Sequence, residues 1–387
     1  MLRFLTAGES HGQLLMGVIE GLPSGLAITA SDINTDLARR QIGYGRGGRM
    51  RIEKDTVEIT CGVRWGKTLG SPIGLIIKNR DWVNWTDKMS PDPSMSGSIP
   101  PETRPRPGHA DLCGLIKYAH TDVRNVLERA SARETAMRVA LGAIAKSFLH
   151  YFSVRIFSHV IEIGGIKAKP GKLSLDLLSD RAEKSELRCA DKKAEGKMKK
   201  IIDEAKKRGD TVGGVFEIIT TNVPVGAGSY SQWDRRINAR LAYAVMSIQA
   251  IKGVEIGVGF DAAAIFGSDV HDAIYYDRSK HKFYRKTNRA GGIEGGITNG
   301  EDIVVRAAMK PIATLYSPLD SVDVKTKKPF KATVERSDYC AVPAASVVGE
   351  AMVAVEIANA FLEKFGGDSM DEIQRNYQGY LDYISKI

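Results

Sequence analysis

The chain has 387 residues, 43% of them hydrophobic and 26% charged, so it can bury one large core or two ordinary ones. Its net charge of +9 indicates an anionic partner, and charge alone leaves nucleic acid, phosphorylated metabolites and membrane surfaces open. The four cysteines form no C-x-x-C pair, which argues against a zinc site or a disulfide framework and fits a reducing cytosol. We expect no metal centre, no signal peptide and no apolar stretch long enough to span a bilayer, and therefore a cytoplasmic location.

Apolar periodicity predicts a mixture of strands and helices along the chain. Strands are predicted at residues 14–21, 51–60, 213–220 and 253–260. Helices are predicted at residues 31–40, 124–150, 234–250, 342–365 and 369–384. Ser31-Asp32 is expected to cap the first of these helices. The Lys/Glu-rich segment 180–209 has only a thin apolar face, which is typical of a solvated helix.

Three stretches interrupt this pattern and are expected to be loops. Residues 41–50 are rich in Gly and Arg, residues 100–109 in Pro and Arg, and residues 275–300 are basic and then Gly-rich. We expect the last of them to be mobile and to be the first choice for a loop that closes over a site. Because no low-complexity linker or short repeat is present, residues 1–387 are expected to form one α/β unit with elaborations.

The pentapeptide Gly8-Glu9-Ser10-His11-Gly12 places a carboxylate, a hydroxyl and an imidazole between two glycines. It also reads as G-x-S-x-G, the nucleophile elbow of α/β-hydrolases. That elbow needs a helix after it and an oxyanion-hole loop earlier in the chain, whereas only seven residues precede Gly8 and a strand pattern follows. These two departures argue against a serine hydrolase that uses Ser10, which is kept only as an alternative. Ser10 is expected instead to make a hydrogen-bonding contact.

Residues 43–48 match G-x-G-x-x-G but follow a predicted helix, so no dinucleotide-binding turn is expected there. Five arginines crowd this region: Arg39, Arg40, Arg46, Arg49 and Arg51. Forked guanidinium groups suit a compact polyanion, and glycines let them approach it closely. An RNA-binding protein that uses the basic loops at 39–51 and 275–290 is the second alternative.

Other candidate residues lie further along the chain. Arg129 and Arg133 are four residues apart on the predicted helix 124–150, where a bound anion would relieve their repulsion. His11 and His109 both sit beside glycines in predicted loops near arginines, which favours an acid–base role, and His109 is expected to open a helix. Asp338 follows Arg336-Ser337 and by default caps the next helix.

Taken together, these segments resemble the chorismate synthases over essentially the whole chain. The matching motifs are TAGESHG (6–12), LARRQIGYGRGGRM (37–50), RPGHAD (106–111), ERASARETAMRVALGA (128–143), QAIKGVEIG (249–257), GGIEGGITNG (291–300), MKPIAT (309–314) and RSDYCAVPAASVVGE (336–350). The chain departs from the family where Arg129-Ala130-Ser131 replaces the more usual Arg-Ser-Ser, so a flavin contact through the middle hydroxyl is absent. The segment 180–209 is similar to a variable insertion.

The resemblance implies a β-α-β sandwich, with helices packed between antiparallel sheets, assembled as a homotetramer. It implies a carbon–oxygen lyase that converts 5-enolpyruvylshikimate 3-phosphate to chorismate and phosphate by an anti 1,4-elimination, with reduced FMN as cofactor. This length is similar to that of the monofunctional type, which receives reduced flavin from an external reductase, although NADPH as the flavin reductant stays open. The same resemblance implies neither a nucleic-acid partner nor a membrane partner.

The resemblance also implies residue roles. His11 would be the acid near the departing phosphate, His109 would stabilise the anionic reduced flavin, and Asp338 would help to remove the C6 proton. A cationic histidine at a helix N-terminus is disfavoured, so nearby anions would have to compensate. Substrate contacts are implied for Ser10, Arg40, Arg46, Arg49, Arg129, Arg133 and Arg336. FMN contacts are implied for Arg129, Ala130, Ser131, Gln249, Ala250, Gly295, Lys310, Pro311, Ile312, Ala313, Thr314 and Arg336. A competing NADP contact is implied for Arg40 and Arg46.

Overall fold

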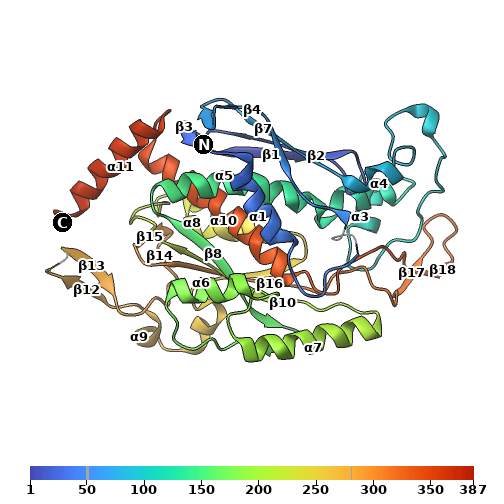
Figure 1. Cartoon of the computed structure of the whole chain (residues 1–387). Helices are drawn as coiled ribbons and strands as arrows, with labels where there is room; N and C mark the ends of the chain where they lie inside the picture. The colour runs from blue at the N-terminus through green and yellow to red at the C-terminus, as the bar shows by residue number, and fades with distance from the viewer. Residues whose placement is uncertain (49–51, 280) are drawn as a thin grey trace.

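In the computed structural model, which describes residues 1–48, 52–279 and 281–387, two large antiparallel sheets enclose a layer of helices (Figure 1). The first sheet has the strand order β1-β2-β7-β4. Its strands are β1 (Arg3–Ala7), β2 (Leu14–Glu20), β7 (Ile73–Lys78) and β4 (Val57–Cys61). Along β2, residues alternate between buried and exposed, because one face of the sheet packs on the helices and the other does not.

The second sheet has the order β11-β16-β10-β8-β9, and every neighbouring pair is antiparallel. Its strands are β11 (Ile251–Ile256), β16 (Ile303–Met309), β10 (Gly214–Thr221), β8 (Arg155–Ile163) and β9 (Ile166–Lys167). The β-branched and aromatic residues of β10 make it the buried centre of this sheet, where Phe216 and Ile218 are fully buried.

The helices between the sheets are α1 (Ala30–Gln41), α5 (Thr135–Tyr151), α8 (Ile237–Met246) and α10 (Val342–Phe365). Glycines set how closely these layers approach. A Cβ on Gly17 of β2 would lie 2.6 Å from Met137 of α5, and one on Gly349 of α10 would lie 2.7 Å from Ile218 of β10. α5 and α10 also touch directly, since a Cβ on Gly142 would lie 2.4 Å from that of Ala351.

A buried ionic cluster ties this layer together. The carboxylate of Glu350 on α10 is fully buried and pairs with Arg39 at 2.7 Å, Lys146 at 2.9 Å and Arg188 at 3.0 Å. Burial alone would raise the pKa of Glu350, but these three cations hold it well below its usual range. The ionised carboxylate of Glu350 therefore links α10 to α1, to α5 and to the segment between α6 and α7.

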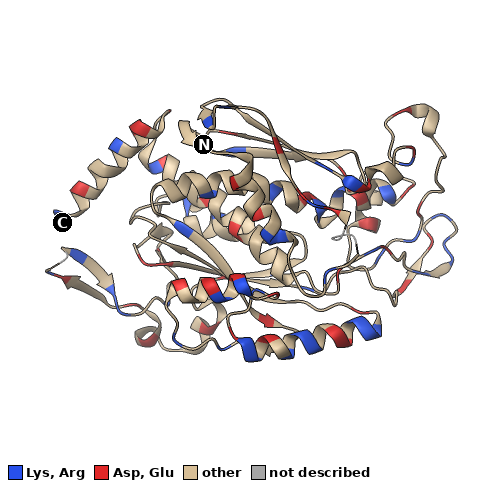
Figure 2. Cartoon of the chain, in the orientation of Figure 1, with Lys and Arg blue, Asp and Glu red and all other residues tan. Residues whose placement is uncertain are grey.

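The remaining elements surround the sandwich. The further helices are α3 (Asp111–Lys117), α4 (Arg124–Ala130), α6 (Leu175–Lys184), α7 (Lys192–Arg208), α9 (Gly267–Val270) and α11 (Met370–Ile384). The further strands are β3 (Ser24–Ala27), β5 (Val63–Arg64), β6 (Lys67–Leu69), β12 (Ile274–Asp277), β13 (Lys282–Arg285), β14 (Ile293–Glu294), β15 (Ile297–Thr298), β17 (Asp320–Val322) and β18 (Pro329–Lys331). α6 and α7 lie outside the second sheet, where basic and acidic side chains alternate along them (Figure 2).

The structure confirms the sandwich that the resemblance implied and corrects several predicted elements. The helix predicted at 124–150 is two helices, because Ser131 is extended (φ −63°, ψ 141°) and its hydroxyl caps the short 3-10 turn Ala132–Glu134 that leads into α5. The predicted segment 180–209 is divided between α6 and α7, and the predicted strand 51–60 forms only from Val57. The 275–300 segment carries two short hairpins rather than one open loop.

Two smaller predictions were also wrong. The cap of α1 is Thr29, which forms a reciprocal capping box with Asp32, instead of Ser31. By length and composition alone, α10 could cross a membrane, which the sequence was not expected to allow. Its apolar residues are instead buried inside the protein, as in the core helix of a globular fold, because β8 and β10 of the second sheet and the helices α1, α5 and α8 pack against it.

Candidate active site

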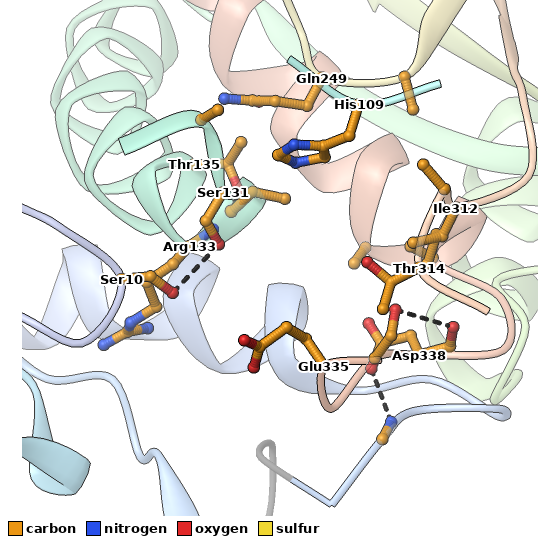
Figure 3. A pocket seen from close by; sticks show the side chains of 18 of the residues that line it. Ser10, His109, Ser131, Arg133, Thr135, Gln249, Ile312, Thr314, Glu335 and Asp338 are labelled. Carbon is orange, nitrogen blue, oxygen red and sulfur yellow. Dashed lines mark hydrogen bonds between the residues drawn. The ribbon is translucent and has the colours of Figure 1, made fainter. Parts of the chain in front are cut away.

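A cavity of about 400 Å³ lies beside the N-terminal ends of α5 and α10 (Figure 3). Segments far apart in the sequence line it: the loop after β1, the Gly/Arg-rich loop after α1, the loop before α3, the turn before α5 and the segments that follow α8 and β16 and precede α10. Its size suits a small-molecule ligand. Because two helices begin at its wall, their N-terminal dipoles favour an anion inside it.

His11 lies in the loop after β1, and its ring is held from two sides. Its Nδ1 is 2.9 Å from Oε1 of Glu128, and its backbone N–H donates to Oε2 of the same carboxylate at 2.8 Å. The indole of Trp85 stacks on the imidazole with ring centroids 4.1 Å apart. Burial alone would raise the pKa of Glu128, but the hydrogen bonds from His11 and the charge of Arg124 hold it below its usual range.

Ser10 precedes His11 and contacts Ser131 and Glu128. Its hydroxyl donates to that of Ser131 at 3.1 Å, and its backbone N–H donates to the Glu128 carbonyl at 3.0 Å. The strand β2 begins only four residues later, so the chain does not make the strand–elbow–helix turn of a hydrolase in the described region 1–48. Ser10 thus hydrogen-bonds to the protein's own groups, and its expected contact with a substrate stays a prediction.

His109 lies before α3, which begins at Asp111, so the prediction that this histidine opens the helix was wrong by two residues. Its Nδ1 makes a very short contact with the buried carboxylate of Asp111. Arg106 donates to the same carboxylate from Nε at 2.8 Å and reaches Thr314 from Nη1 at 2.8 Å. Although burial opposes ionisation, His109 and Arg106 keep the pKa of Asp111 far below its usual range. Asp111 is thus the anion that a cationic histidine here was expected to need.

The arginine-rich character of the wall is evident around Asp55. This buried carboxylate receives Arg133 at 2.5 Å and Arg40 at 3.3 Å, and the Nε of Arg40 also donates to Thr135 at 3.1 Å. Burial, which the charges of Arg46 and Arg133 reinforce, lowers the pKa of Arg40 to about 10 although Asp55 opposes this. Crowded cations of this kind gain from an anionic ligand.

The Gly/Arg-rich loop reaches the cavity by a close approach to the segment before α10. A Cβ on Gly47 would lie 2.4 Å from the carbonyl oxygen of Ser337, so only glycine fits there. The backbone N–H of Gly47 donates to Asp338 at 2.6 Å, and Arg46 pairs with the same carboxylate at 2.8 Å. Asp338 therefore holds this loop beside the cavity. It does not cap α10, whose N-cap is Ala341. Arg49 lies outside the described residues.

The structure brings most of the expected residues together around this one cavity (Figure 3). Cavity-lining residues among them are Ser10, His11, Arg40, Arg46, His109, Ala130, Ser131, Arg133, Gln249, Ala250, Lys310, Ile312, Ala313, Thr314, Arg336 and Asp338. Pro311 lies within the 310–314 run but does not line the cavity described here. Arg129 is exposed and donates to the carbonyls of Gly8 and Thr6, and because the helix breaks at Ser131 it does not form the expected pair with Arg133.

Gly295 is the other expected contact that lies elsewhere. It forms the turn between β14 and β15, and no residue of this hairpin lines the cavity. The same holds for the rest of the 275–300 segment, since none of its described residues lines this cavity. A contact from Gly295, and a closing role or mobility for this segment, stay predictions.

An isoalloxazine ring and a phosphate both find suitable partners in the cavity. Leu127, Ile248, Met309 and Val348 provide aliphatic wall, and small alanines leave room between them. Oε1 of Gln249 is buried and has no hydrogen-bond partner among the described residues, whereas Nη2 of Arg133 makes no hydrogen bond but lies 3.6 Å from Oε2 of Glu53. A buried acceptor such as that of Gln249 is costly unless a ligand satisfies it. The residues present therefore fit a bound flavin mononucleotide.

Sequence reasoning missed several residues that shape this site. Glu128, Asp111 and Arg106 lie inside motifs that the resemblance quoted, and Asp111 is only two residues from His109, so a carboxylate partner could have been inferred there. Trp85 carries no such signal, because its contact with His11 depends on the tertiary fold alone. Glu335 also lines the cavity, near Arg124 at 3.8 Å, and its side chain points into it in Figure 3.

Comparison with known proteins agrees with this geometry. A family model described as chorismate synthase matches residues 2–362. Proteins named chorismate synthase from Geobacter metallireducens and Geobacter sulfurreducens are 64% and 63% identical, each alignment covering 99% of both chains. A crystal structure titled as a chorismate synthase superposes with a TM-score of 0.80 at 45% identity, over 100% of this chain and 99% of the other. The chain therefore belongs to the chorismate synthase family, and chorismate synthase is the activity that this membership assigns to it.

Proposed function

We propose that the cavity is where this chain eliminates phosphate from 5-enolpyruvylshikimate 3-phosphate to give chorismate, the last step of the shikimate pathway to aromatic amino acids. The observation that carries the proposal is the pair of histidines, each held by a buried carboxylate, on the wall of one arginine-rich cavity. Neither an RNA-binding protein nor a serine hydrolase requires this arrangement, and both alternatives are set aside.

Reduced FMN fits the apolar part of the cavity. We assign its contacts to Ala130, Ser131, Gln249, Ala250, Lys310, Ile312, Ala313, Thr314 and Arg336, with Arg129, Pro311 and Gly295 as further expected contacts. When bound, reduced FMN would supply electron density to the site without net oxidation or reduction of the substrate. The chain's own part is to position the substrate, exclude water and move protons.

The anionic groups of the substrate suit the guanidinium groups of the wall. Arg40, Arg46 and Arg133 are buried or nearly so, whereas the side chain of Arg336 is 50% exposed and pairs with Asp81 at 2.8 Å. A phosphate and two carboxylates would replace part of the contacts that these arginines now make with acidic residues. Ser10, Arg49 and Arg129 complete the proposed set of substrate contacts.

Proton movements fall to three residues. His11, whose Nδ1 is occupied by Glu128, has Nε2 left to donate a proton to the departing phosphate. His109 is held against Asp111, which lets it carry a positive charge beside the anionic cofactor. Asp338, now paired with Arg46, is assigned to the removal of the C6 proton.

Finer properties follow as proposals from the family. We assign a homotetramer, a cytoplasmic location and an external supply of reduced flavin. NADPH as the reductant, bound by Arg40 and Arg46, would compete with their role in substrate binding, because both already lie on the cavity wall.

The test is turnover by His11→Ala and His109→Ala under anaerobic conditions with reduced FMN. Both variants should lose most of the activity while the far-ultraviolet circular dichroism is unchanged. His150→Ala is the matched control, since His150 is exposed at the C-terminal end of α5 and does not line this cavity. Full activity in His11→Ala and His109→Ala would contradict the roles given to these histidines.

A further inference from the structure

The loop that carries His11 has anchors other than the side chain of Glu128. The backbone N–H of Ser10 donates to the Glu128 carbonyl at 3.0 Å, and the amide of Asn79 donates to the carbonyls of Glu9 and Gly12 at 3.2 and 2.7 Å. These bonds fix the path of the loop. The Glu128 carboxylate is therefore not the only group that holds the loop, and its contact with the ring of His11 needs a separate explanation.

That carboxylate accepts both hydrogen-bond donors that His11 presents on this side. Oε2 receives the backbone N–H at 2.8 Å, and Oε1 lies 2.9 Å from Nδ1 of the ring. An ionised carboxylate only accepts, so Nδ1 must carry the hydrogen in this contact. Nε2 is then the ring nitrogen left for a ligand in the cavity that His11 lines.

Glu128 is itself held in one position. Its side chain is 1% exposed, and Arg124 one turn earlier on α4 lies 3.3 Å from Oε1. The guanidinium of Arg124 also lies 5.2 Å from the centroid of the Trp85 ring, which stacks on His11 at an interplanar angle of 21°. The carboxylate thus fixes which nitrogen faces the cavity, and the indole fixes the plane of the ring.

We propose that Glu128 is a positioning residue for His11: it holds the imidazole in the Nδ1–H form when the ring is neutral and stabilises it when protonated, so that Nε2 points into the cavity, with Trp85 as the second support. This inference rests on the proposed role of His11 as the acid. The balance of the step is simple, because the proton leaves Nε2 for the departing phosphate oxygen while Nδ1 keeps its hydrogen bonded to Glu128. Glu128 takes no proton and touches no substrate.

The structure offers a matched control for substitution of Glu128. His159 and Glu217 form a third histidine–carboxylate pair at 3.0 Å, on β8 and β10, and neither residue lines the cavity. Glu128→Gln keeps the shape of the side chain but has only one oxygen, so it cannot accept from both the ring and the backbone N–H of His11. Glu217→Gln makes the same chemical change away from the cavity.

Two measurements separate positioning from mere stability. First, nitrogen NMR of the His11 ring, identified by its absence in His11→Ala, should show hydrogen on Nδ1 in the ligand-free native protein and a mixture of tautomers in Glu128→Gln. Second, kcat of Glu128→Gln should fall by about tenfold or more with little change in KM, in line with loss of an orienting carboxylate. Glu217→Gln should match the native protein in the His11 tautomer and in kcat. Trp85→Phe, which keeps an aromatic ring, should keep more activity than Trp85→Ala.

The outcomes distinguish this inference from the proposed function. If Glu128→Gln keeps the native tautomer, or turns over as fast as Glu217→Gln while His11→Ala is inactive, the positioning role is overturned and the role of His11 stands. If His11→Ala itself is fully active, the proposed function of His11 fails first, whatever the NMR of Glu128→Gln shows. If Glu128→Gln loses activity without a change in tautomer, Glu128 does not act through His11 and the inference is also overturned.

Discussion

Replacing Gly142 by alanine tests the closest contact between the two central helices. Alanine in a helix interior is favoured over glycine by about 1 kcal/mol, so propensity alone predicts stabilisation. The new Cβ, however, would lie 2.4 Å from the Cβ, 2.6 Å from the Cα and 2.8 Å from the carbonyl oxygen of Ala351. Ordinary contacts are about 3.5–4.0 Å, so α5 and α10 would have to separate by about 1 Å. Overpacking of this kind costs about 1–3 kcal/mol, and its upper part applies because backbone atoms cannot rotate away.

The expected net result is a loss of about 1–2 kcal/mol in the free energy of unfolding, read from the urea midpoint at matched protein concentration. Gly196→Ala is the control, since Gly196 is exposed on α7 and a Cβ there meets nothing within 4 Å. It should be stabilising by about 1 kcal/mol. Because both central helices begin at the cavity, Gly142→Ala should also weaken flavin binding. Equal stabilisation by the two substitutions would refute the packing argument.

Three further outcomes are expected from buried groups. Cys61 and Cys113 are exposed and should react quickly with a thiol reagent at pH 8. Burial raises the pKa of Cys189 to about 11 and that of Cys340 to about 12, so these two thiols should react only after unfolding. Four fast-reacting thiols in the folded protein would contradict this prediction. Glu350→Ala removes the fully buried carboxylate that Arg39, Lys146 and Arg188 share, and leaves them only Asp36 and Glu183 as acidic partners among the described residues, so it should cost about 3–5 kcal/mol, measured by chemical unfolding; a change below about 1 kcal/mol would show that these two carboxylates suffice. Since the pKa of Glu350 is lower in the folded than in the unfolded chain, its contribution is present above about pH 4.3 and is lost as pH falls further, so stability should decline in acid, and more steeply in the native protein than in Glu350→Gln.

Much of the fold was readable from the sequence because strong apolar runs dominate it. The predicted range 342–365 matches α10 in full, and the strand predicted at 213–220 differs from β10 by one residue at each end. The break at Ser131 was not readable, because no glycine or proline marks it and the apolar spacing continues across it. What ends α4 is a capping hydroxyl and the tertiary contacts of its neighbours, which periodicity does not record.

The site divides in a similar way. Residues inside long motifs, such as His11, His109 and Asp338, were found by resemblance and do line one cavity. What holds them was largely missed, because Glu128 lies 117 positions from His11 in the sequence and Trp85 meets it only in the folded protein. A single sequence states which side chains carry chemistry more readily than it states which nitrogen of a ring faces the substrate.

The most direct test of the whole account is anaerobic turnover of 5-enolpyruvylshikimate 3-phosphate by the native protein with dithionite-reduced FMN. The account predicts stoichiometric release of phosphate and chorismate, with most of this activity lost in His11→Ala and in His109→Ala at the same flavin occupancy. A folded native protein that binds the flavin yet releases no phosphate would contradict it.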